Sequence, residues 1–282
     1  MVGRYLKSSI SSESFEVIET SRTQELNEKV YLDLADHDSI NEVSMVGVDH
    51  AIIFASITNQ EICNKDPELA NKVNVEGTIK LLEKLTEKKI HIIFPSTSLV
   101  FNGMTPGNTN LIGADPIGVY GKNKYLVERK IVNSYGENTA ILRLSKIINK
   151  DFQIFHNWCE AFSNDEDIYP FNDLNFSPVS IQIVTDVIFK LLKNSASGIY
   201  NLSSSNQLSY AQAAIYLATK FNQEQSNISP INALESLKDI YLPQHTVLDC
   251  TMLKGLDIRQ SYAEESLDYF IKFNDIYKRH KN

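Results

Sequence analysis

The sequence has 282 residues and a formal net charge of −8, from 27 Lys and Arg against 35 Asp and Glu. A chain of this length that is 43% hydrophobic can form one large globular domain or two unequal ones. An acidic balance disfavours binding to phosphate backbones, and no apolar run reaches the roughly 18 residues that span a bilayer. We therefore expect a cytoplasmic protein with no nucleic-acid partner and no membrane partner.

The first half of the sequence alternates short apolar runs with amphipathic segments, which is typical of βαβ units and a parallel sheet. One helix begins with Asp66 as its N-cap and Pro67 at its first position, and continues to about residue 88 with an apolar stripe that starts at Leu69. A second amphipathic helix is predicted over 119–134. Strands are predicted at 15–20, 30–34, 51–55, 90–95 and 139–144.

The second half mixes short strands, at 177–180 and 198–201, with helices at 183–193, 209–221 and 261–277. The last two helices begin with capping-box patterns, Ser209 to Gln212 and Ser261 to Glu264. These patterns predict an α/β protein with a doubly wound parallel sheet in residues 1–150. A smaller α/β part follows in 151–282, with segments interleaved between the two.

A tyrosine–lysine pair at Tyr120 and Lys124 lies on the second amphipathic helix. Residues four apart share one helix face, and a nearby ammonium lowers the pKa of a phenol, which makes it a usable acid or base. The spacing alone is weak evidence, because it also occurs at Tyr216 and Lys220 and at Tyr277 and Lys281. We interpret those two pairs as helix packing and as a charged surface tail.

The context of Tyr120 sets it apart from the other two tyrosines. The predicted strand at 90–95 is followed by Ser96, Thr97 and Ser98, and ligands of open α/β sheets bind beyond the carboxyl ends of the strands. A hydroxyl there could hold a carbonyl oxygen beside the phenol. A plain polar turn is the alternative reading of the same residues.

Together these segments resemble a known family. STSLVFNG followed by PIGVYGKNKYLVE, with NVEGT before them, resembles the extended short-chain dehydrogenase/reductases that act on nucleotide-sugars. Within them the likeness is to the dTDP-4-dehydrorhamnose reductase group, whose pattern is STDYVFDG and PLNVYGKTKLAGE. The resemblance covers nearly the whole chain, and it implies a Rossmann-like dinucleotide-binding domain with a smaller substrate-binding part.

The resemblance implies catalytic roles for three residues. Thr97 would polarise the keto oxygen of the substrate, and Tyr120 would donate the proton. Lys124 would bind the nicotinamide ribose and lower the pKa of Tyr120. The implied substrate is a nucleotide-linked sugar, and a homodimer is an open possibility. The three cysteines, Cys63, Cys159 and Cys250, lie far apart and the histidines lack ligand spacing, so we expect no metal.

The resemblance also implies cofactor contacts. Ala55 and Ser56 match the short side chains that lie along the cofactor, and Asp33 with Leu34 matches the pair near the adenine. Asn74, in NVEGT, matches a helix asparagine close to the active site. A backbone contact inside the helix is an equally good reading of Asn74.

The choice of cofactor depends on the end of the strand predicted at 15–20. A carboxylate at this place binds the ribose hydroxyls of NAD, whereas a 2′-phosphate requires a cation. Here Glu19 comes one position too early, and Ser21 and Arg22 follow it. A hydroxyl and a guanidinium suit a phosphate, so we favour NADP(H) over NAD(H).

The beginning of the chain departs from the family. The family opens with a strand and a GxxGxxG loop, but this chain begins MVGRYL, so Gly3 matches the third glycine and the first strand is missing. We expect either a truncated start or a lost phosphate loop. Ser98 and Leu99 also replace the Asp-Glu that the dehydratase branch uses, which disfavours dehydration.

Three functions follow from the resemblance. The leading one is an NADP-dependent reductase of a nucleotide-linked 4-keto-deoxysugar, with the hydride from nicotinamide and the proton from Tyr120. The alternatives are an NAD-dependent sugar-nucleotide epimerase and a non-catalytic sugar-nucleotide-binding or regulatory protein on the same fold.

Overall fold

The computed structural model describes residues 1–10, 15–23, 29–104, 114–236 and 243–277. The chain forms two compact units whose segments interleave along the sequence. Unit 1 comprises Met1–Phe101, Asn110–Arg143 and Thr185–Tyr200, and unit 2 comprises Asn102–Thr109, Leu144–Val184 and Asn201–Asn282. Within the described ranges, no helix is long and apolar enough to cross a membrane.

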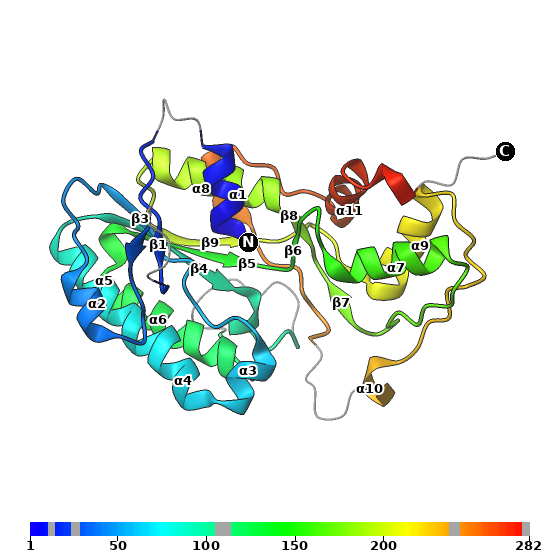
Figure 1. The fold of residues 1–282 in the computed structure, drawn as a ribbon, viewed down its shortest axis with the longest axis horizontal. Helices are drawn as coiled ribbons and strands as arrows, with labels where there is room; N and C mark the ends of the chain where they lie inside the picture. The colour runs from blue at the N-terminus through cyan, green and yellow to red at the C-terminus, as the bar shows by residue number, and fades with distance from the viewer. Residues whose placement is uncertain (11–14, 24–28, 105–113, 237–242, 278–282) are drawn as a thin grey trace. The chain divides into compact units, whose positions relative to one another are not determined.

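The main sheet has four strands in the order β3 (His50–Ile52), β4 (His91–Thr97), β5 (Thr139–Leu144) and β9 (Gly198–Leu202). Strands β3 and β4 are parallel, with His50 opposite His91. Helices cover both faces of the sheet, with α1 (Val2–Ser9) and α8 (Ile181–Lys193) on one face and α5 (Thr78–Glu87) and α6 (Val119–Ser134) on the other (Figure 1). Every residue of β4 and β5 is therefore buried. The predicted α/β class with a parallel sheet is confirmed.

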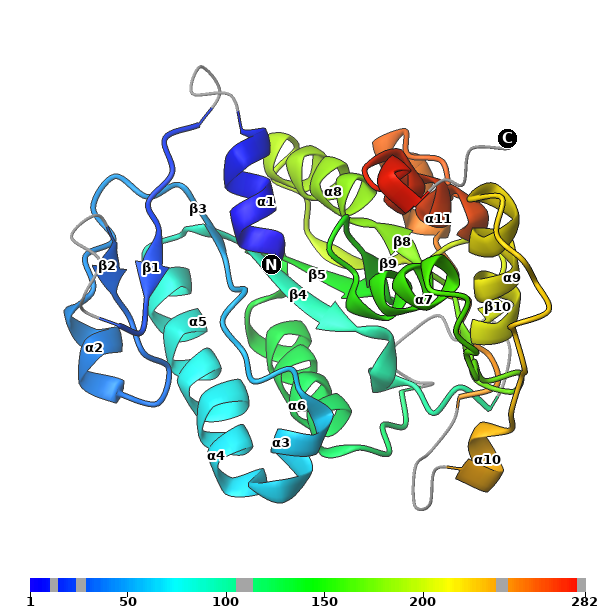
Figure 2. The ribbon, with the colours of Figure 1, turned by 45° about the vertical axis from the view of Figure 1, so that its right-hand side comes forward.

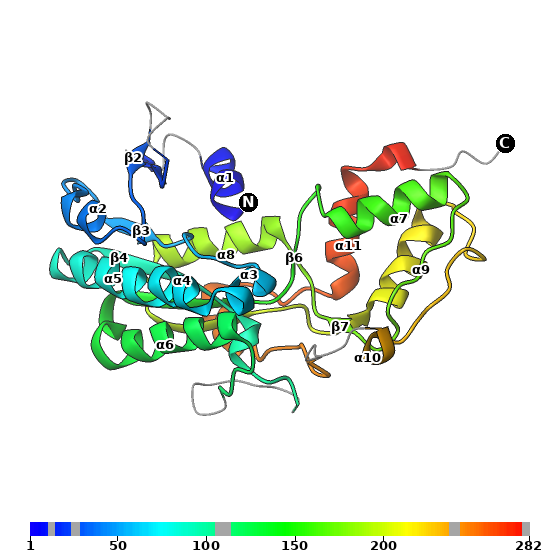
Figure 3. The same ribbon diagram turned by 60° about the horizontal axis from the view of Figure 1, so that its bottom comes forward.

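The first two strands form a separate parallel pair, β1 (Thr20–Ser21) with β2 (Val30–Tyr31), which is not hydrogen-bonded to β3 in the described part of the chain (Figure 3). The strands predicted at 15–20 and 30–34 were thus too long. Val17 and Ile18 are 39% and 56% exposed and have no ladder partner, so β1 is short. After β2, the Asp33 carboxylate accepts a hydrogen bond from the Ala35 amide and turns the chain toward α2 (His37–Glu42).

The long helix predicted from Asp66 begins as expected but is not regular. The Asp66 carboxylate accepts from the Leu69 amide, and Pro67 is the first residue of α4 (Pro67–Asn71). A π-helical segment, Lys72–Gly77, then separates α4 from α5. A Cβ at Gly77 would lie 1.9 Å from the Leu34 carbonyl oxygen, so the helix abuts the backbone there. A π-helical turn changes the angular position of the residues after it relative to those before it. The predicted apolar stripe is therefore interrupted, and Leu69, before the π segment, is 41% exposed.

The segments that carry the catalytic candidates follow the prediction more closely. Helix α6 spans the predicted residues 119–134, and β5 spans 139–144. The strand predicted at 51–55 is β3, which lies one residue earlier at its start and ends at Ile52. Strand β4 runs two residues beyond its predicted end, so Ser96 and Thr97 are its last residues rather than part of a polar turn. A 3₁₀ turn, Ser98–Val100, follows.

Unit 2 contains two small sheets and an aromatic core. Strand β6 (Ile147–Ile148) is parallel to β8 (Val179–Ser180), and β7 (Asn175–Phe176) is antiparallel to β10 (Leu208–Ser209). The core lies among helices α7 (Gln153–Ser163), α9 (Tyr210–Lys220) and α11 (Ala263–Lys272), with Phe155, Trp158, Phe162, Phe221 and Phe270 in contact. The short helix α10 (Ala233–Ser236) completes the unit, and Figure 2 shows α7, α9 and α11 grouped together.

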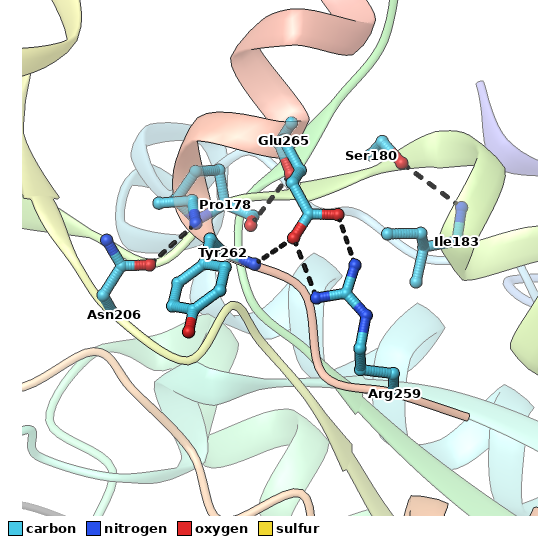
Figure 4. Close-up of polar contacts among 9 residues, drawn as sticks. Pro178, Ser180, Ile183, Asn206, Arg259, Tyr262 and Glu265 are labelled. Atoms are coloured by element: carbon cyan, nitrogen blue, oxygen red, sulfur yellow. Dashed lines mark hydrogen bonds and ion pairs between the residues drawn. The ribbon is translucent and has the colours of Figure 1, made fainter. Parts of the chain in front are cut away.

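One predicted capping box is confirmed and one is wrong. Ser209 and Gln212 cap α9 reciprocally, as expected. At α11 the box is not Ser261 with Glu264. The Glu265 carboxylate accepts from the Tyr262 amide at 2.9 Å and pairs with Arg259, while the Asn206 side-chain oxygen accepts from the Ala263 amide at 2.8 Å (Figure 4). The sequence allows both registers, and Asn206, from a distant segment, fixes the second.

Other helix and strand boundaries in the second half of the chain differ from the predicted ones. Helix α8 begins at Ile181, two residues before its predicted start, and the Ser180 hydroxyl accepts from the Ile183 amide in its first turn (Figure 4). Helix α11 ends at Lys272, and a separate 3₁₀ turn, Asp275–Tyr277, follows it. The strand predicted at 177–180 is β8, shortened to Val179–Ser180.

Candidate active site at the end of strand β4

Helix α6 lies directly along the carboxyl end of β4. Near the start of α6, a Cβ at Gly121 would lie 2.2 Å from the Leu99 carbonyl oxygen, so the two backbones touch. One turn later, the Lys124 ammonium donates to the Pro95 carbonyl at 2.8 Å. These two contacts align the helix with residues 95–99, and Thr97 lies midway between them. The structure thus brings the Tyr120–Lys124 pair and the hydroxyl-rich strand end together.

Thr97 can donate a hydrogen bond to a ligand. Its side chain is 8% exposed, and Oγ1 accepts from the Leu99 amide at 3.2 Å. A hydroxyl that accepts from a backbone N–H keeps its own proton for another acceptor. Among the described residues no group accepts that proton, so it is available to a bound carbonyl oxygen.

Tyr120 is half-buried, and its electrostatics differ from the sequence-based expectation. Burial, together with a smaller contribution from the nearby Cys63 thiol, raises the pKa of Tyr120 to about 12. The expected lowering of this pKa by Lys124 is not found, because the ammonium is directed at the Pro95 carbonyl. In this state the phenol remains protonated at neutral pH, which suits a proton donor rather than a base.

Lys124 is a deeply buried cation at the site. It is 4% exposed, and its ammonium lies 4.4 Å from the centre of the Phe94 ring. Burial lowers the pKa of Lys124 to about 8, while the carboxylate of Glu128, one turn further along α6, opposes that effect. The side chain is therefore held close to its own titration at neutral pH.

The other tyrosine–lysine pairs are engaged elsewhere. The Tyr216 hydroxyl donates to Asp268 at 2.9 Å, and the Lys220 ammonium lies 5.0 Å from the Tyr216 ring. The Tyr277 hydroxyl is 2.9 Å from Nδ1 of His156, and Lys281 lies outside the described residues. The interpretation of Tyr216 as a packing residue agrees with these contacts.

The loop after β3 is tied to the π-helical segment through Asn74. This side chain is 2% exposed; its oxygen accepts from the Ser56 hydroxyl at 2.9 Å and from the Ile57 amide at 2.7 Å, and its nitrogen donates to the Ile57 carbonyl at 2.9 Å. Asn74 therefore holds Ser56 and Ile57 in place instead of bonding inside its own helix. Ala55 itself is exposed.

The end of β1 carries positive charge. The Glu19 carboxylate forms ion pairs with Lys7 at 3.1 Å and with Lys29 at 3.0 Å, and these two ammonium groups lower its pKa. Arg22 is exposed and forms no ion pair with any described residue. The Ser21 hydroxyl lies 3.0 Å from that of Thr23. Glu19 is thus occupied, and Arg22 remains available to an anion.

The remaining cofactor candidates lie on the same unit. Gly3 is in the first turn of α1, where a Cβ would lie 3.3 Å from the Phe54 ring, so the glycine permits close packing after β3. Leu34 is 3% exposed and belongs to the core, whereas the Asp33 carboxylate bonds to the Ala35 amide. Among the residues that the structure describes, no three His, Cys, Asp or Glu side chains are grouped as metal ligands.

Sequence reasoning missed three features of the site. Gly121 had no signal other than its place after Tyr120, and Cys63 lies near Tyr120 from helix α3 (Gln60–Lys65). The third is the buried ion pair between Glu128 and Arg143. Two signals in the sequence could have indicated this ion pair. Glu128 lies four residues after Lys124, on the same helix face, and Arg143 is a charged residue inside the apolar run of β5, where a buried charge needs a partner.

The chain resembles known proteins over most of its length. The family model described as the RmlD substrate binding domain matches residues 1–273. A curated relative, methionine adenosyltransferase 2 subunit beta of Xenopus tropicalis, is 23% identical, with 92% of this chain and 80% of that protein covered. A protein of Haloferax volcanii named "Probable low-salt glycan biosynthesis reductase" is 27% identical over 80% of this chain and 71% of its own length.

A solved structure shows the same fold. The dTDP-4-dehydrorhamnose reductase from Bacillus anthracis, in complex with NADP, superposes with a TM-score of 0.85 at 21% sequence identity. The match covers 96% of this chain and 95% of that one.

Proposed function

Because the chain belongs to the RmlD substrate binding domain family, as the sequence resemblance predicted, we propose that it is an NADP-dependent reductase of a nucleotide-linked 4-keto-deoxysugar. The observation that supports this proposal is the docking of α6 along residues 95–99, which brings the first turns of the helix, with Tyr120 and Lys124, against the strand end that carries Thr97. A reductase needs a hydrogen-bond donor for the keto oxygen and an acid for the alkoxide that forms, and these residues supply both.

Each residue has one step in this proposal. The Thr97 hydroxyl, whose oxygen is fixed by the Leu99 amide, donates to the keto oxygen and polarises it. The Tyr120 phenol then delivers a proton to the same oxygen as it becomes an alcohol. Lys124 would provide a donor for the ribose hydroxyls of a bound dinucleotide. A bound nicotinamide dinucleotide would supply the hydride.

The direction of the reaction is supported by the state of Tyr120. A phenol with its pKa raised to about 12 is protonated at neutral pH and can donate to an alkoxide. An epimerase must first remove a proton from a sugar hydroxyl, and the phenolate that this step needs is scarcely populated at neutral pH when the pKa is about 12. Reduction is therefore favoured over epimerisation.

The preference for NADP rests on the end of β1. With Glu19 paired to Lys7 and Lys29, no free carboxylate is available there for the ribose hydroxyls among the described residues. The Arg22 guanidinium is exposed and suits a 2′-phosphate. The Bacillus anthracis reductase with the same fold carries NADP in its crystal structure.

The test is a hydride-transfer assay. The purified chain is incubated with NADPH or NADH and a dTDP-linked 4-keto-6-deoxyhexose, and the loss of reduced nicotinamide is followed together with product formation by NMR. We expect turnover with NADPH that exceeds turnover with NADH. Conversion of UDP-glucose to UDP-galactose without net loss of a cofactor would instead identify an epimerase.

A second candidate is a non-catalytic subunit, and the names of relatives favour it. Methionine adenosyltransferase 2 subunit beta of Xenopus tropicalis is named as a subunit of another enzyme, and it matches 92% of this chain. In this case the chain would bind a nucleotide ligand without turnover and assemble with an adenosyltransferase. Absence of hydride transfer, combined with co-elution with a purified methionine adenosyltransferase, would support this candidate.

A further inference from the structure

A buried ion pair lies behind the candidate active site. The Arg143 guanidinium donates to the Glu128 carboxylate through Nε, at 3.1 and 3.2 Å, and through Nη2, at 2.7 Å. Both side chains are fully buried. A two-nitrogen contact of this kind fixes the orientation of a carboxylate as well as its position.

This ion pair joins the three elements that carry the catalytic candidates. Glu128 belongs to α6, two turns after Tyr120, and Arg143 belongs to β5. The Arg143 guanidinium lies 4.8 Å from the centre of the Phe101 ring, and Phe101 ends the short turn that begins after Thr97. Helix α6, strand β5 and the segment after β4 therefore meet at one buried point.

The carboxylate of Glu128 acts on Lys124. The two residues are four apart on α6, so they share one face of the helix. Burial lowers the pKa of Lys124, and Glu128 is the group that opposes this effect. The other titratable groups around this helix face are Tyr120 on α6, Cys63 on α3 and Arg143 on β5, and Arg143 is already paired with the carboxylate.

Stability alone does not account for the pair. A buried ion pair pays a large desolvation cost, and two apolar side chains of similar volume are often as stable. In addition, Nη1 of Arg143 is buried without an acceptor among the described residues, which is unfavourable. The pair is better explained by the effect of the Glu128 carboxylate on Lys124.

We propose that Glu128, fixed by Arg143, is a positioning residue that keeps Lys124 protonated and seated against the Pro95 carbonyl. The proposal deepens the proposed function, because it gives a source for the charge that Lys124 brings to the site. The proposal concerns the residue that sets the protonation state of Lys124, and the experiment that tests it requires neither cofactor nor substrate. It can therefore fail while the reductase activity stands, and it can hold if that activity fails.

The test follows the titration of Lys124 through protein stability. Burial lowers the folded-state pKa of Lys124 to about 8 from its ordinary 10.5, so the folded chain binds fewer protons than the unfolded chain between these values. The unfolding free energy of the wild type, relative to Lys124→Met, should therefore rise with pH from about 8 to 10.5 and be flat below about 8. Urea unfolding at a series of pH values measures this window.

The same comparison is then made with Glu128→Gln. Loss of the carboxylate should move the lower edge of the window down by about one pH unit. Residues four apart on a helix lie close together, and an opposite charge that near shifts a pKa by roughly 1–3 units. If Glu128→Gln does not fold, because it leaves Arg143 unpaired, the apolar pair Glu128→Met with Arg143→Met should fold and show a shift in the same direction, smaller because the positive charge of Arg143 is lost as well. Glu128→Asp should restore the wild-type window.

The matched control is Glu265→Gln. Glu265 also accepts two bonds from an arginine, Arg259, but its side chain is 38% exposed and it lies on α11 in unit 2. This variant should leave the Lys124 window in place. A structural role for Glu128 would lower the unfolding free energy equally at all pH values, so an unmoved window in both Glu128 variants would overturn the proposal.

Discussion

A methyl group at position 121 should destabilise the protein, although alanine favours a helix more than glycine does. The Cβ of Gly121→Ala would lie 2.2 Å from the carbonyl oxygen of Leu99 and 3.0 Å from its carbon. Ordinary contact begins at 3.4 Å, so the backbones must separate by about 1 Å. Overpacking of this kind costs about 1–3 kcal/mol, and the better helix propensity returns at most about 1 kcal/mol. We expect a net loss of up to about 2 kcal/mol.

The same displacement should affect the candidate site. Because Gly121 follows Tyr120, a shift of α6 away from Leu99 moves the phenol relative to Thr97. A misplacement of about 1 Å can cost roughly 100-fold in rate, so turnover should fall further than stability alone would explain.

Urea unfolding and steady-state reduction measure both effects, with Gly255→Ala as the matched control. Nothing lies within 4 Å of a Cβ at Gly255, and this change should leave the protein as stable as the wild type or stabilise it by about 0.4–1 kcal/mol. A Gly121→Ala protein with wild-type stability and turnover would refute the contact between α6 and Leu99.

Three further predictions concern other parts of unit 1. Arg22→Ala should weaken NADPH binding at least about tenfold more than NADH binding, since a charge-assisted contact contributes roughly 1.5–3 kcal/mol. Calorimetry measures both affinities, with the exposed Arg129→Ala as the control. Equal losses of the two cofactors in Arg22→Ala, or a selective loss of NADPH in the control, would rule out a phosphate contact. Burial lowers the pKa of His91 below its ordinary 6.5, so the unfolding free energy should fall as pH drops below 6.5, and His91→Gln should lose that dependence. Asn74→Ala should destabilise the chain by about 1–3 kcal/mol, because the Ile57 amide loses its partner and the Ile57 carbonyl keeps only the Cys63 thiol; an unchanged urea midpoint would contradict this.

Local sequence patterns predicted the structure correctly where an element is determined by residues within its own segment. Helix α6 was predicted to the residue, and the start of α4 followed from Asp66 and Pro67. The tyrosine–lysine spacing became informative through the neighbouring run at Ser96 and Thr97. These signals depend on residues within a few positions of each other, and the structure keeps them together.

Distant contacts decided what the sequence could not show. The π-helical segment ends at Gly77, where the helix abuts the Leu34 carbonyl, and the start of α11 is capped by Asn206 from a distant segment. The raised pKa of Tyr120 reflects burial by elements far away in the chain. The partner of Glu128 lies 15 residues away on β5, where no helix spacing could indicate it.

The measurement that tests the central claim most directly is the rate of hydride transfer in Tyr120→Phe under single-turnover conditions, with NADPH and a dTDP-linked 4-keto-6-deoxyhexose. The matched control is Tyr216→Phe, which removes a hydroxyl from the second tyrosine–lysine pair, where it donates to Asp268. The account predicts that Tyr120→Phe loses about 10²–10⁴-fold in rate while its unfolding midpoint stays within the range of the control. Hydride transfer in Tyr120→Phe at the wild-type rate would contradict it.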